Sequence, residues 1–394
     1  MRWVAGTLAV LVAAVAAFLG WSAWELGRPR STAAPDRDVW ARPASGVREV
    51  RLPVMVEVSP TDRLALLEFE DDADPILTGL EPQVIERDGI TGFRVLAYRQ
   101  DGGVDAYDDP ALPLDGPDAF RVIGTGLHRH VQVPLADSTF EVDAAGRLHL
   151  AFAFTDADGR AVEVTVRETT TRRSVPTNLL APVGLSSRNP AYFPLFLLND
   201  FEFIRSVGTQ LDVVVDGRPV ALKGPPVPLP LQGQLRTFAK YTTDPEIIQV
   251  FPTWRDEVRV VRTDPGRDVH TATDGVRYLF AGEALERILV NSTEVVFAPP
   301  LDTTAPGTGR FTMTSYPDLG AVGGTWAVAV DGHTARLELG IDHVSVPHQR
   351  DPLYRLIVNE RTFFGTWPTG YRYEAQIDHT SGRVDARWSN DGPD

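Results

Sequence analysis

The sequence predicts an all-β protein of two packed antiparallel β lobes, barrels or sandwiches, that follow a single N-terminal transmembrane helix. Three observations lead to this prediction: an uncharged apolar segment at the N-terminus, apolar residues that alternate with polar ones along most of the chain, and turn sequences between the alternating segments. With 394 residues, of which 43% are hydrophobic, the chain is long enough to build two cores.

The composition excludes several classes of function. Because 53 acidic residues outnumber 38 basic ones and the net charge is −15, no nucleic acid is expected as a partner. The absence of cysteine excludes disulfides, thiol nucleophiles and cysteine-bound metals. All basic residues except Lys223 and Lys240 are arginines, and this preference for GC-rich codons predicts a bacterial source.

Residues 1–24 are predicted to form a transmembrane signal-anchor. The run from Trp3 to Trp24 carries no charge and is longer than the about 7–15 residues of a signal-peptide core, so we expect it to be retained. A cleaved signal peptide is the alternative and would lead to the same compartment. No second apolar span follows, which predicts a single-pass protein of the cell membrane with its C-terminal domain outside the cytoplasm.

Beyond the anchor, residues 25–47 are rich in Pro, Arg, Ala and Ser and are predicted to be a flexible tether. The proline-rich run 224–230 cannot form a central strand, because proline lacks the backbone donor. We therefore expect one β lobe at 48–230 and a second at 231–394.

Four hairpins are predicted from alternating segments on either side of a turn. They join residues 148–155 to 162–166, 211–215 to 218–222, 326–330 to 334–339, and 371–377 to 383–388. The Asp-Gly pairs at 216–217 and 331–332 favour the positive φ values of tight hairpin turns. Outside the anchor, the only helical candidates are a short stretch at Ala284–Val290 and a turn at Asp244–Ile248.

His128 and His130 are the strongest candidates for metal ligands. On a strand, both imidazoles and Gln132 would share one face. A third ligand would have to come from a later strand, where His149, Glu141 and Asp143 are available. The ligand set is incomplete, so a hydrated strand face is the favoured interpretation, and we predict neither a tightly held metal nor a cofactor.

The aromatic segment Tyr192–Ile204 contains the candidate catalytic and ligand-binding residues. Asp200 and Glu202 would lie on one strand face, where a carboxylate must face solvent, pair with Arg205, or line a cavity with a raised pKa. Solvent exposure is the favoured interpretation, but in a cavity either group would be a candidate general acid. Tyr192 and Phe196, together with these two carboxylates, are the candidate ligand-binding residues.

Two adjacent acid–histidine pairs are further candidates for acid–base chemistry. Neighbouring residues on a strand point to opposite faces, so neither Asp342-His343 nor Asp378-His379 is expected to pair internally. If the two strands are neighbours, Asp342 would instead meet His379. A role at the surface or at a hairpin end is the favoured interpretation.

Three segments resemble two-lobed lipocalin-like β proteins related to carotenoid hydratases. They are Gly159–Val166, Leu179–Gly184 and Val215–Val220. The resemblance implies a pair of calyx-like lobes with an apolar pocket and, in some members, hydration or isomerisation of a lipid-like substrate. Where those proteins have an Asp-His-rich, Trp-flanked motif, this chain has residues 224–230, so no catalytic residue is transferred.

The sequence contains no motif that supplies a nucleophile, a base or a cofactor site, so it leaves open whether the protein is an enzyme and favours a non-enzyme. We predict a membrane-anchored extracytoplasmic protein of the bacterial cell envelope that binds an apolar or lipid-like ligand or an envelope protein. The alternatives are a lipocalin-like hydratase or isomerase, and a glycan hydrolase with two carboxyl groups about 5–10 Å apart.

Overall fold

The computed structural model describes residues 34–391 except 45, 115, 136, 171–176, 225–228, 232–233, 317–319, 346–353 and 355–363. The predicted anchor at 1–24 and residues 25–33 and 45 of the predicted tether therefore lie outside the described residues. In the described part of the tether, Val39 and Trp40 are buried in a cluster with Leu279, so this part packs on the domain and the prediction of a flexible tether is wrong there. Within the described ranges, no helix has the length and apolar character needed to span a bilayer.

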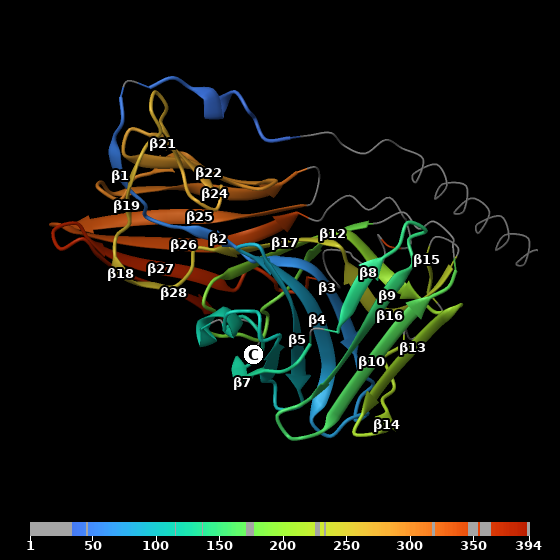
Figure 1. Ribbon diagram of the computed structural model, residues 1–394. Helices are drawn as coiled ribbons and strands as arrows, with labels where there is room; N and C mark the ends of the chain where they lie inside the picture. The colour runs from blue at the N-terminus through green and yellow to red at the C-terminus, as the bar shows by residue number, and fades with distance from the viewer. Residues whose placement is uncertain are drawn as a thin grey trace, which may run out of the picture.

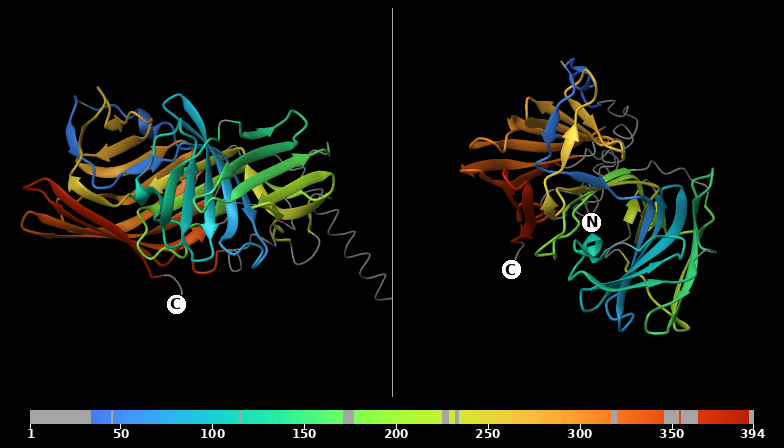
Figure 2. Two further views of the ribbon diagram at one scale, coloured as in Figure 1. Left: turned by 60° about the horizontal axis from the view of Figure 1, so that its bottom comes forward. Right: turned by 60° about the vertical axis from the view of Figure 1, so that its left-hand side comes forward.

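The described elements are strands, apart from the short 3-10 helices η1 (Val39–Ala41) and η2 (Pro117–Phe120). The predicted all-β fold class is therefore confirmed. The strands form curled sheets, and the views in Figures 1 and 2 show two groups, with the C-terminal strands on one side and the strands of the middle of the chain on the other.

The C-terminal group is a ten-stranded antiparallel sheet in which nearly every strand pairs with its neighbour along the chain. Its order is β18 (Trp254–Glu257), β28 (Arg383–Asn390), β27 (Tyr371–Asp378), β26 (Thr334–Ser345), β25 (Gly320–Asp331), β24 (Gly307–Ser315), β23 (Thr293–Leu301), β22 (Ala284–Val290), β21 (Arg277–Ala281) and β20 (Val269–Thr271). Apolar and polar residues alternate regularly here; Leu337, Leu339 and Ile341 on β26 are all buried.

The other group contains an eleven-stranded sheet. Its path is β2 (Val56–Val58), β17 (Asp244–Val250), β12 (Phe193–Arg205), β16 (Gln234–Thr242), β3 (Thr61–Glu68), β4 (Leu77–Arg87), β5 (Ile90–Arg99), β6 (Val104–Asp108) and β7 (Leu127–Gln132), with β11 (Thr177–Ala181) on β12 and β15 (Leu229–Leu231) on β16. All of these pairings are antiparallel except that of β6 with β7. The parallel pair requires a crossover, which residues 109–126 provide.

Two smaller sheets complete the fold. A five-stranded sheet has the order β14 (Arg218–Pro219), β13 (Thr209–Val215), β10 (Ala161–Glu168), β9 (Leu148–Thr155) and β8 (Thr139–Val142). A two-stranded sheet pairs β1 (Glu49–Arg51) with β19 (Val260–Arg262).

Two main hydrophobic cores hold these sheets together. The sandwich core joins the five-stranded sheet to one face of the eleven-stranded sheet; Phe93 and Phe152, one from each sheet, have ring centroids 5.6 Å apart. The large core joins the inner face of the ten-stranded sheet to β2, β12 and β17. There Phe193 lies 5.7 Å from Trp367 and 5.8 Å from Trp388, measured between ring centroids.

The four predicted hairpins are confirmed as β9–β10, β13–β14, β25–β26 and β27–β28. The two Asp-Gly turns differ in detail. Asp216 and Gly217 both have positive φ, 51° and 72°, as a type I′ turn requires. In the other turn Asp331 still pairs with Thr334, and Gly332 takes the positive φ of 61°.

Both helical predictions in the outer region are wrong. Ala284–Val290 is strand β22, which is paired on both sides with β21 and β23. The register shift toward β21 leaves Glu286 as an extra residue, whereas the shift toward β23 leaves residues 297–300 without partners on β22. Leu285 and Ile288 are fully buried. Asp244–Ile248 belongs to β17, which lies between β12 and β2. In both segments, tertiary strand pairing overrides a local preference for helix.

The predicted boundary between lobes at residues 230 and 231 falls inside the eleven-stranded sheet. Strands β16 and β17 follow that boundary in the chain, yet they pair with β3 and β12, which precede it. The division into lobes at this point stays a prediction.

Candidate functional site

Asp200 and Glu202 face different charged groups. Asp200 has a φ of 48°, which interrupts the alternation of side chains along β12. Leu198 and Phe201, which are three residues apart and would face opposite sides of a regular strand, therefore pack in the same apolar cluster. Glu202 lies 3.5 Å from Arg236 and 3.9 Å from Arg205. Asp200 lies near Asp244, whose pKa is raised by burial and then by the charges of Asp200 and Asp62. The shared face that regular alternation predicts is therefore not formed.

Glu202 belongs to a buried ionic network that joins two sheets. Arg205 Nη1 donates to Glu168 Oε2 at 2.6 Å, and the backbone N–H of Arg205 donates to the other carboxylate oxygen at 3.0 Å. Glu168 also accepts from the N–H of Leu148, so the carboxylate connects β9, β10 and β12. Burial lowers the pKa of the neighbouring Arg236. These contacts indicate a structural role, in which the ionic network holds the two sheets together.

Tyr192 and Phe196 are packed apart from each other. Tyr192 is buried with Val122 and Ala191, and its hydroxyl donates to the carbonyl of Ala119 at 3.1 Å. Phe196 is half-buried against the cluster that contains Phe201 and Leu198. Tyr192 thus helps to fix the 109–126 crossover, and Phe196 packs on β12.

His128 and His130 each bond to a buried aspartate of β6. His128 Nδ1 lies 2.8 Å from Asp105 Oδ1, and His130 Nε2 lies 2.9 Å from Asp108 Oδ2. A register shift between β6 and β7 places the two contacts on opposite faces of the sheet, because Asp105 and Asp108 are three residues apart on a strand. The predicted common face for the two imidazoles is therefore wrong.

No group of three His, Asp or Glu in the described part of the chain is arranged to hold a metal ion. The predicted supplementary ligands lie on β8 and β9 and in the turn between them. His149 Nε2 is 3.7 Å from Asp143 Oδ2, and Glu141 pairs across the strands with His149. Asp143 is mainly engaged by Arg147, whose hydrogen bonds lower its pKa to about 2.

Asp342 and His343 do pair internally, contrary to prediction, with Asp342 Oδ1 and His343 Nδ1 2.6 Å apart. The reason is a bulge: Gly323 pairs with His343 and Gly324 with Ile341, so Asp342 is an extra residue and the alternation is interrupted. His379 instead contacts the carbonyl of Thr303 at 2.8 Å. The expected meeting of Asp342 with His379 is not formed.

The sequence did not reveal a group of polar side chains on the face of β4, β5 and β6 opposite the sandwich core. Glu81 accepts hydrogen bonds from the Tyr98 hydroxyl and from Gln83 Nε2, the latter at 2.7 Å. Beside them, Arg94 forms a two-point ion pair with the fully buried Asp108, with both distances 2.7 Å. Burial alone would raise the pKa of Asp108, but hydrogen bonds from Arg94 and His130 outweigh it and lower the pKa.

A hollow of about 330 Å³, which we call the Tyr98 pocket, opens on this polar face. It lies where β4 begins and β5 ends, beside the crossover and the loop at 183–186. It is lined by Thr78, Tyr98, Arg99, Gly102, Gly103, Val122, Ile123, Gly124, Val183, Gly184 and Ser186. Burial, reinforced by the charge of Glu81, raises the pKa of Tyr98 well above its usual range. Burial also raises the pKa of Glu81. A phenol backed by a buried carboxyl group at a pocket wall makes this the candidate functional site.

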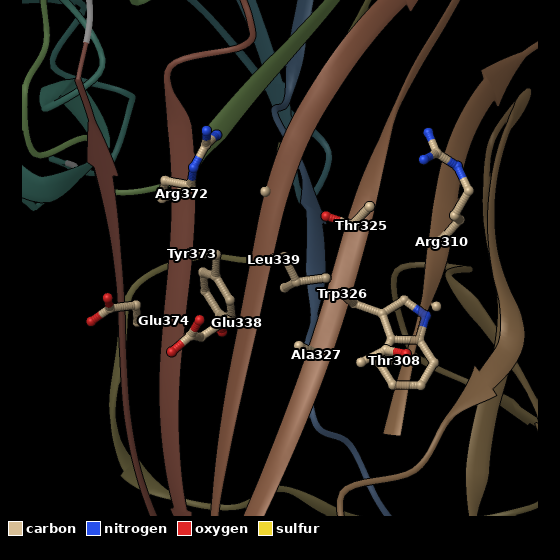
Figure 3. Close-up of a pocket in the computed structure, with 12 residues that line it drawn as sticks. Thr308, Arg310, Thr325, Trp326, Ala327, Glu338, Leu339, Arg372, Tyr373 and Glu374 are labelled. Atoms are coloured by element: carbon tan, nitrogen blue, oxygen red, sulfur yellow. The ribbon is translucent and has the colours of Figure 1, made fainter. Parts of the chain in front are cut away.

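A groove of about 570 Å³ crosses the outer face of the ten-stranded sheet (Figure 3). It runs over β24 to β27 between two rows of cross-strand neighbours: Arg310, Thr325, Gly340 and Arg372 form one row, and Thr308, Ala327, Glu338 and Glu374 form the other. Its charges have partners within the sheet, such as Asp342 at 3.0 Å from Arg310 and Arg387 at 2.8 Å from Glu374. The groove therefore has the character of a solvated sheet face.

A third hollow, of about 270 Å³, lies beside Tyr278 and His270. None of these three hollows is lined by a residue that the sequence predicted for the site. Arg94, Leu96 and Tyr98 alternate with the core residues Phe93, Val95 and Ala97, a pattern that indicates a solvated outer face. No sequence signal shows that the crossover covers that face.

Comparisons with known proteins found no family model that matches the chain, and no match among curated proteins or solved structures. The resemblance to lipocalin-like proteins therefore stays a prediction.

Proposed function

We propose that the chain is a membrane-anchored extracytoplasmic protein of the bacterial cell envelope that binds a small apolar or lipid-like molecule in the Tyr98 pocket. The observation that carries the proposal is the composition of the pocket wall. Ile123 and Val183, both partly exposed, supply apolar surface, and Tyr98 and Ser186 are polar side chains of the same wall. Small-molecule sites commonly combine apolar walls with a few placed polar groups in this way.

The proposed location follows from the uncharged run from Trp3 to Trp24 and the predicted tether at 25–47. We expect protease added to intact spheroplasts to digest the outer domain. Digestion only after lysis would contradict the topology.

For the architecture we propose two packed lipocalin-like lobes, at 48–230 and 231–394. Two separate cores support two lobes: the sandwich core is built mainly from the first segment and the large core mainly from the second. The division is not clean, because β2 and β12 contribute to the large core and Ala239 and Tyr241 to the sandwich core. In this arrangement β16 and β17 return from the second segment to complete the sheet of the first.

The ligand proposal is tested by native mass spectrometry and lipid extraction of the full chain purified from membranes. We expect a specific co-purifying molecule in the natural protein and its loss in Ile123→Trp, because the larger side chain fills the pocket. Ile90→Trp is the matched control, since Ile90 is 42% exposed on β5 and lines none of the hollows. Equal amounts of ligand in both variants, or a co-purifying protein in place of a small molecule, would contradict the proposal.

An acid–base enzyme is a second candidate, and the buried Glu81 favours it. A carboxyl group with a raised pKa beside a pocket has the property needed for a general acid in a hydratase or isomerase. For a glycan hydrolase, Asp200 and Glu202 would have to share a cleft, and neither lines the hollows described above.

A further inference from the structure

We propose that one end of the domain, which we call the arginine end, lies against the membrane and contacts its anionic headgroups beside the predicted anchor. The arginine end consists of residues 37–51, which include η1 and β1, and residues 259–268, which include β19. This inference rests on the proposed membrane anchor at 1–24 and adds a second, electrostatic contact with the same bilayer.

The first argument is that the chain is fixed to the surface of the domain where it enters. Trp40 is 3% exposed, packs with Leu279 and donates its indole N–H to Glu294 Oε1 at 3.3 Å. The guanidinium carbon of Arg277 lies 5.1 Å from the centre of the Trp40 ring. Farther along the chain, β1 pairs with β19. The entry point of the chain is therefore fixed at the arginine end.

The second argument is the short distance in sequence between the predicted anchor and this entry point. Residues 25–33 separate Trp24 from Ala34, the first described residue, and in any conformation they extend at most about 32 Å. A domain of this size has a radius of gyration of roughly 20 Å and hence a diameter of about 50 Å. Figures 1 and 2 show β1 and β19 at one end of the molecule and β14 at the other. The segment therefore keeps the end that carries η1 and β1 nearer to the bilayer than β14.

The third argument is the charge of the arginine end. It contains seven arginines and four carboxylates, although the whole chain has a net charge of −15. Three of these arginines form ion pairs: Arg42 with Glu286, Arg48 with Asp268, and Arg262 with Glu49. Four have no ion-pair partner within the described part of the chain, namely Arg37, Arg51, Arg259 and Arg267. Such arginines are attracted to a bilayer with anionic phosphate headgroups.

The fourth argument is the outer face of the β1–β19 sheet. Val50 and Val261 are buried, so the alternate positions Arg51 and Val260, which are cross-strand neighbours, face outward. Val260 is 56% exposed, and Arg259 beside it is also exposed. An exposed apolar side chain between cations suits the headgroup region of a bilayer, where the apolar group leaves water and the cations meet phosphates.

The test uses the full chain in lipid nanodiscs. Because the chain has no cysteine, a single introduced cysteine carries the fluorescent donor, and a headgroup-labelled lipid is the acceptor. The donor is attached to Val260→Cys at the arginine end or to Arg218→Cys on β14. In nanodiscs of equal parts phosphatidylcholine and phosphatidylglycerol, we expect energy transfer from position 260 to be at least twofold more efficient than from position 218.

Charge reversal tests the electrostatic part of the contact. Arg51→Glu combined with Arg259→Glu should at least halve the transfer from position 260, because the headgroups then repel this face. Arg218→Glu is the matched control, since it reverses an exposed arginine at the opposite end and should leave the transfer unchanged. Nanodiscs of phosphatidylcholine alone, or added salt, should lower the transfer as the charge reversal does. Circular dichroism confirms that each variant is folded.

The outcomes separate this inference from the proposed function. If alkaline carbonate extracts the protein from membranes, the anchor is contradicted, and the inference is contradicted with it. If the protein stays in the membrane but positions 260 and 218 transfer equally, or the charge reversal has no effect, only the inference is overturned. Self-quenching of the label at position 260 in nanodiscs that hold two chains would identify a second copy as the partner of this end and would also overturn it.

Discussion

The ten-stranded and eleven-stranded sheets place their polar side chains differently. On β26 to β28 of the ten-stranded sheet, buried apolar residues alternate with exposed charged ones, and the ion pairs lie in solvent; Arg387 and Glu374, for example, are 66% and 41% exposed. The eleven-stranded sheet buries ions on both faces. On one face Arg205 pairs with Glu168 of the five-stranded sheet, and on the other Arg94 and Asp108 lie beneath the crossover.

The difference shows how far a strand pattern determines the environment of a side chain. Alternation specifies which residues share a face of the sheet. Whether that face is exposed to solvent depends on which other segments of the chain pack against it. A buried ion must be compensated by partners, whereas an exposed one is compensated by water. The two sheets should therefore respond very differently to the loss of one charge.

The largest effect is expected from Arg205→Ala. It leaves Glu168, which is 1% exposed, without its main counter-charge, so we expect a loss of about 3–5 kcal/mol in the free energy of unfolding. Urea unfolding of the full chain in detergent, followed by tryptophan fluorescence, measures this loss. A change below about 1 kcal/mol would show that the buried network behaves like a surface pair.

A smaller effect, with a characteristic pH dependence, is expected at Asp108. Its lowered pKa means that the folded state favours the carboxylate, so this stability is present above the unfolded pKa and is lost as pH falls through the folded value. Asp108→Asn should cost about 1.5–3 kcal/mol at neutral pH. The cost should shrink in acid.

Glu81 should show the opposite trend on the same sheet face. Its pKa is raised, so its contribution is present below the unfolded pKa and is lost as pH rises through the folded value. Stability differences between natural protein and variant, measured from pH 3 to 8, should therefore change in opposite directions for Asp108→Asn and Glu81→Gln. Parallel profiles would contradict the assignment of the two charge states.

The smallest effect is expected on the ten-stranded sheet. Arg387→Ala removes an exposed pair with Glu374, and such pairs contribute about 0.2–1 kcal/mol. The same unfolding measurement applies, and added salt should remove the difference. A loss comparable to that of Arg205→Ala would remove the contrast between the sheets.

The sequence predicts the hairpins well because their information is local. Turn residues and alternation lie within about twenty positions, as at Asp216-Gly217 between β13 and β14. Two kinds of structural information cannot be obtained from such short sequence segments. One is backbone irregularity: the bulge at Asp342 and the positive φ at Asp200 reverse the expected side-chain directions. The other is strand pairing, which turns Ala284–Val290 into β22.

The candidate site could not be predicted for a related reason. Tyr98 on β5 bonds to Glu81 on β4, and the pocket that Tyr98 lines is completed by Val122 and Ile123 of the crossover. The proximity of these segments depends on the parallel pairing of β6 with β7, which no local pattern specifies.

That parallel pairing also has an evolutionary consequence. A crossover is obligatory between β6 and β7, but its length and composition are not set by the sheet, because loops that cross a surface tolerate insertion and substitution. Residues 109–126 can therefore vary while the strand order persists. Divergent descendants of this chain could acquire new ligands by exchanging Val122 and Ile123 and still inherit Glu81 and Tyr98 from the scaffold.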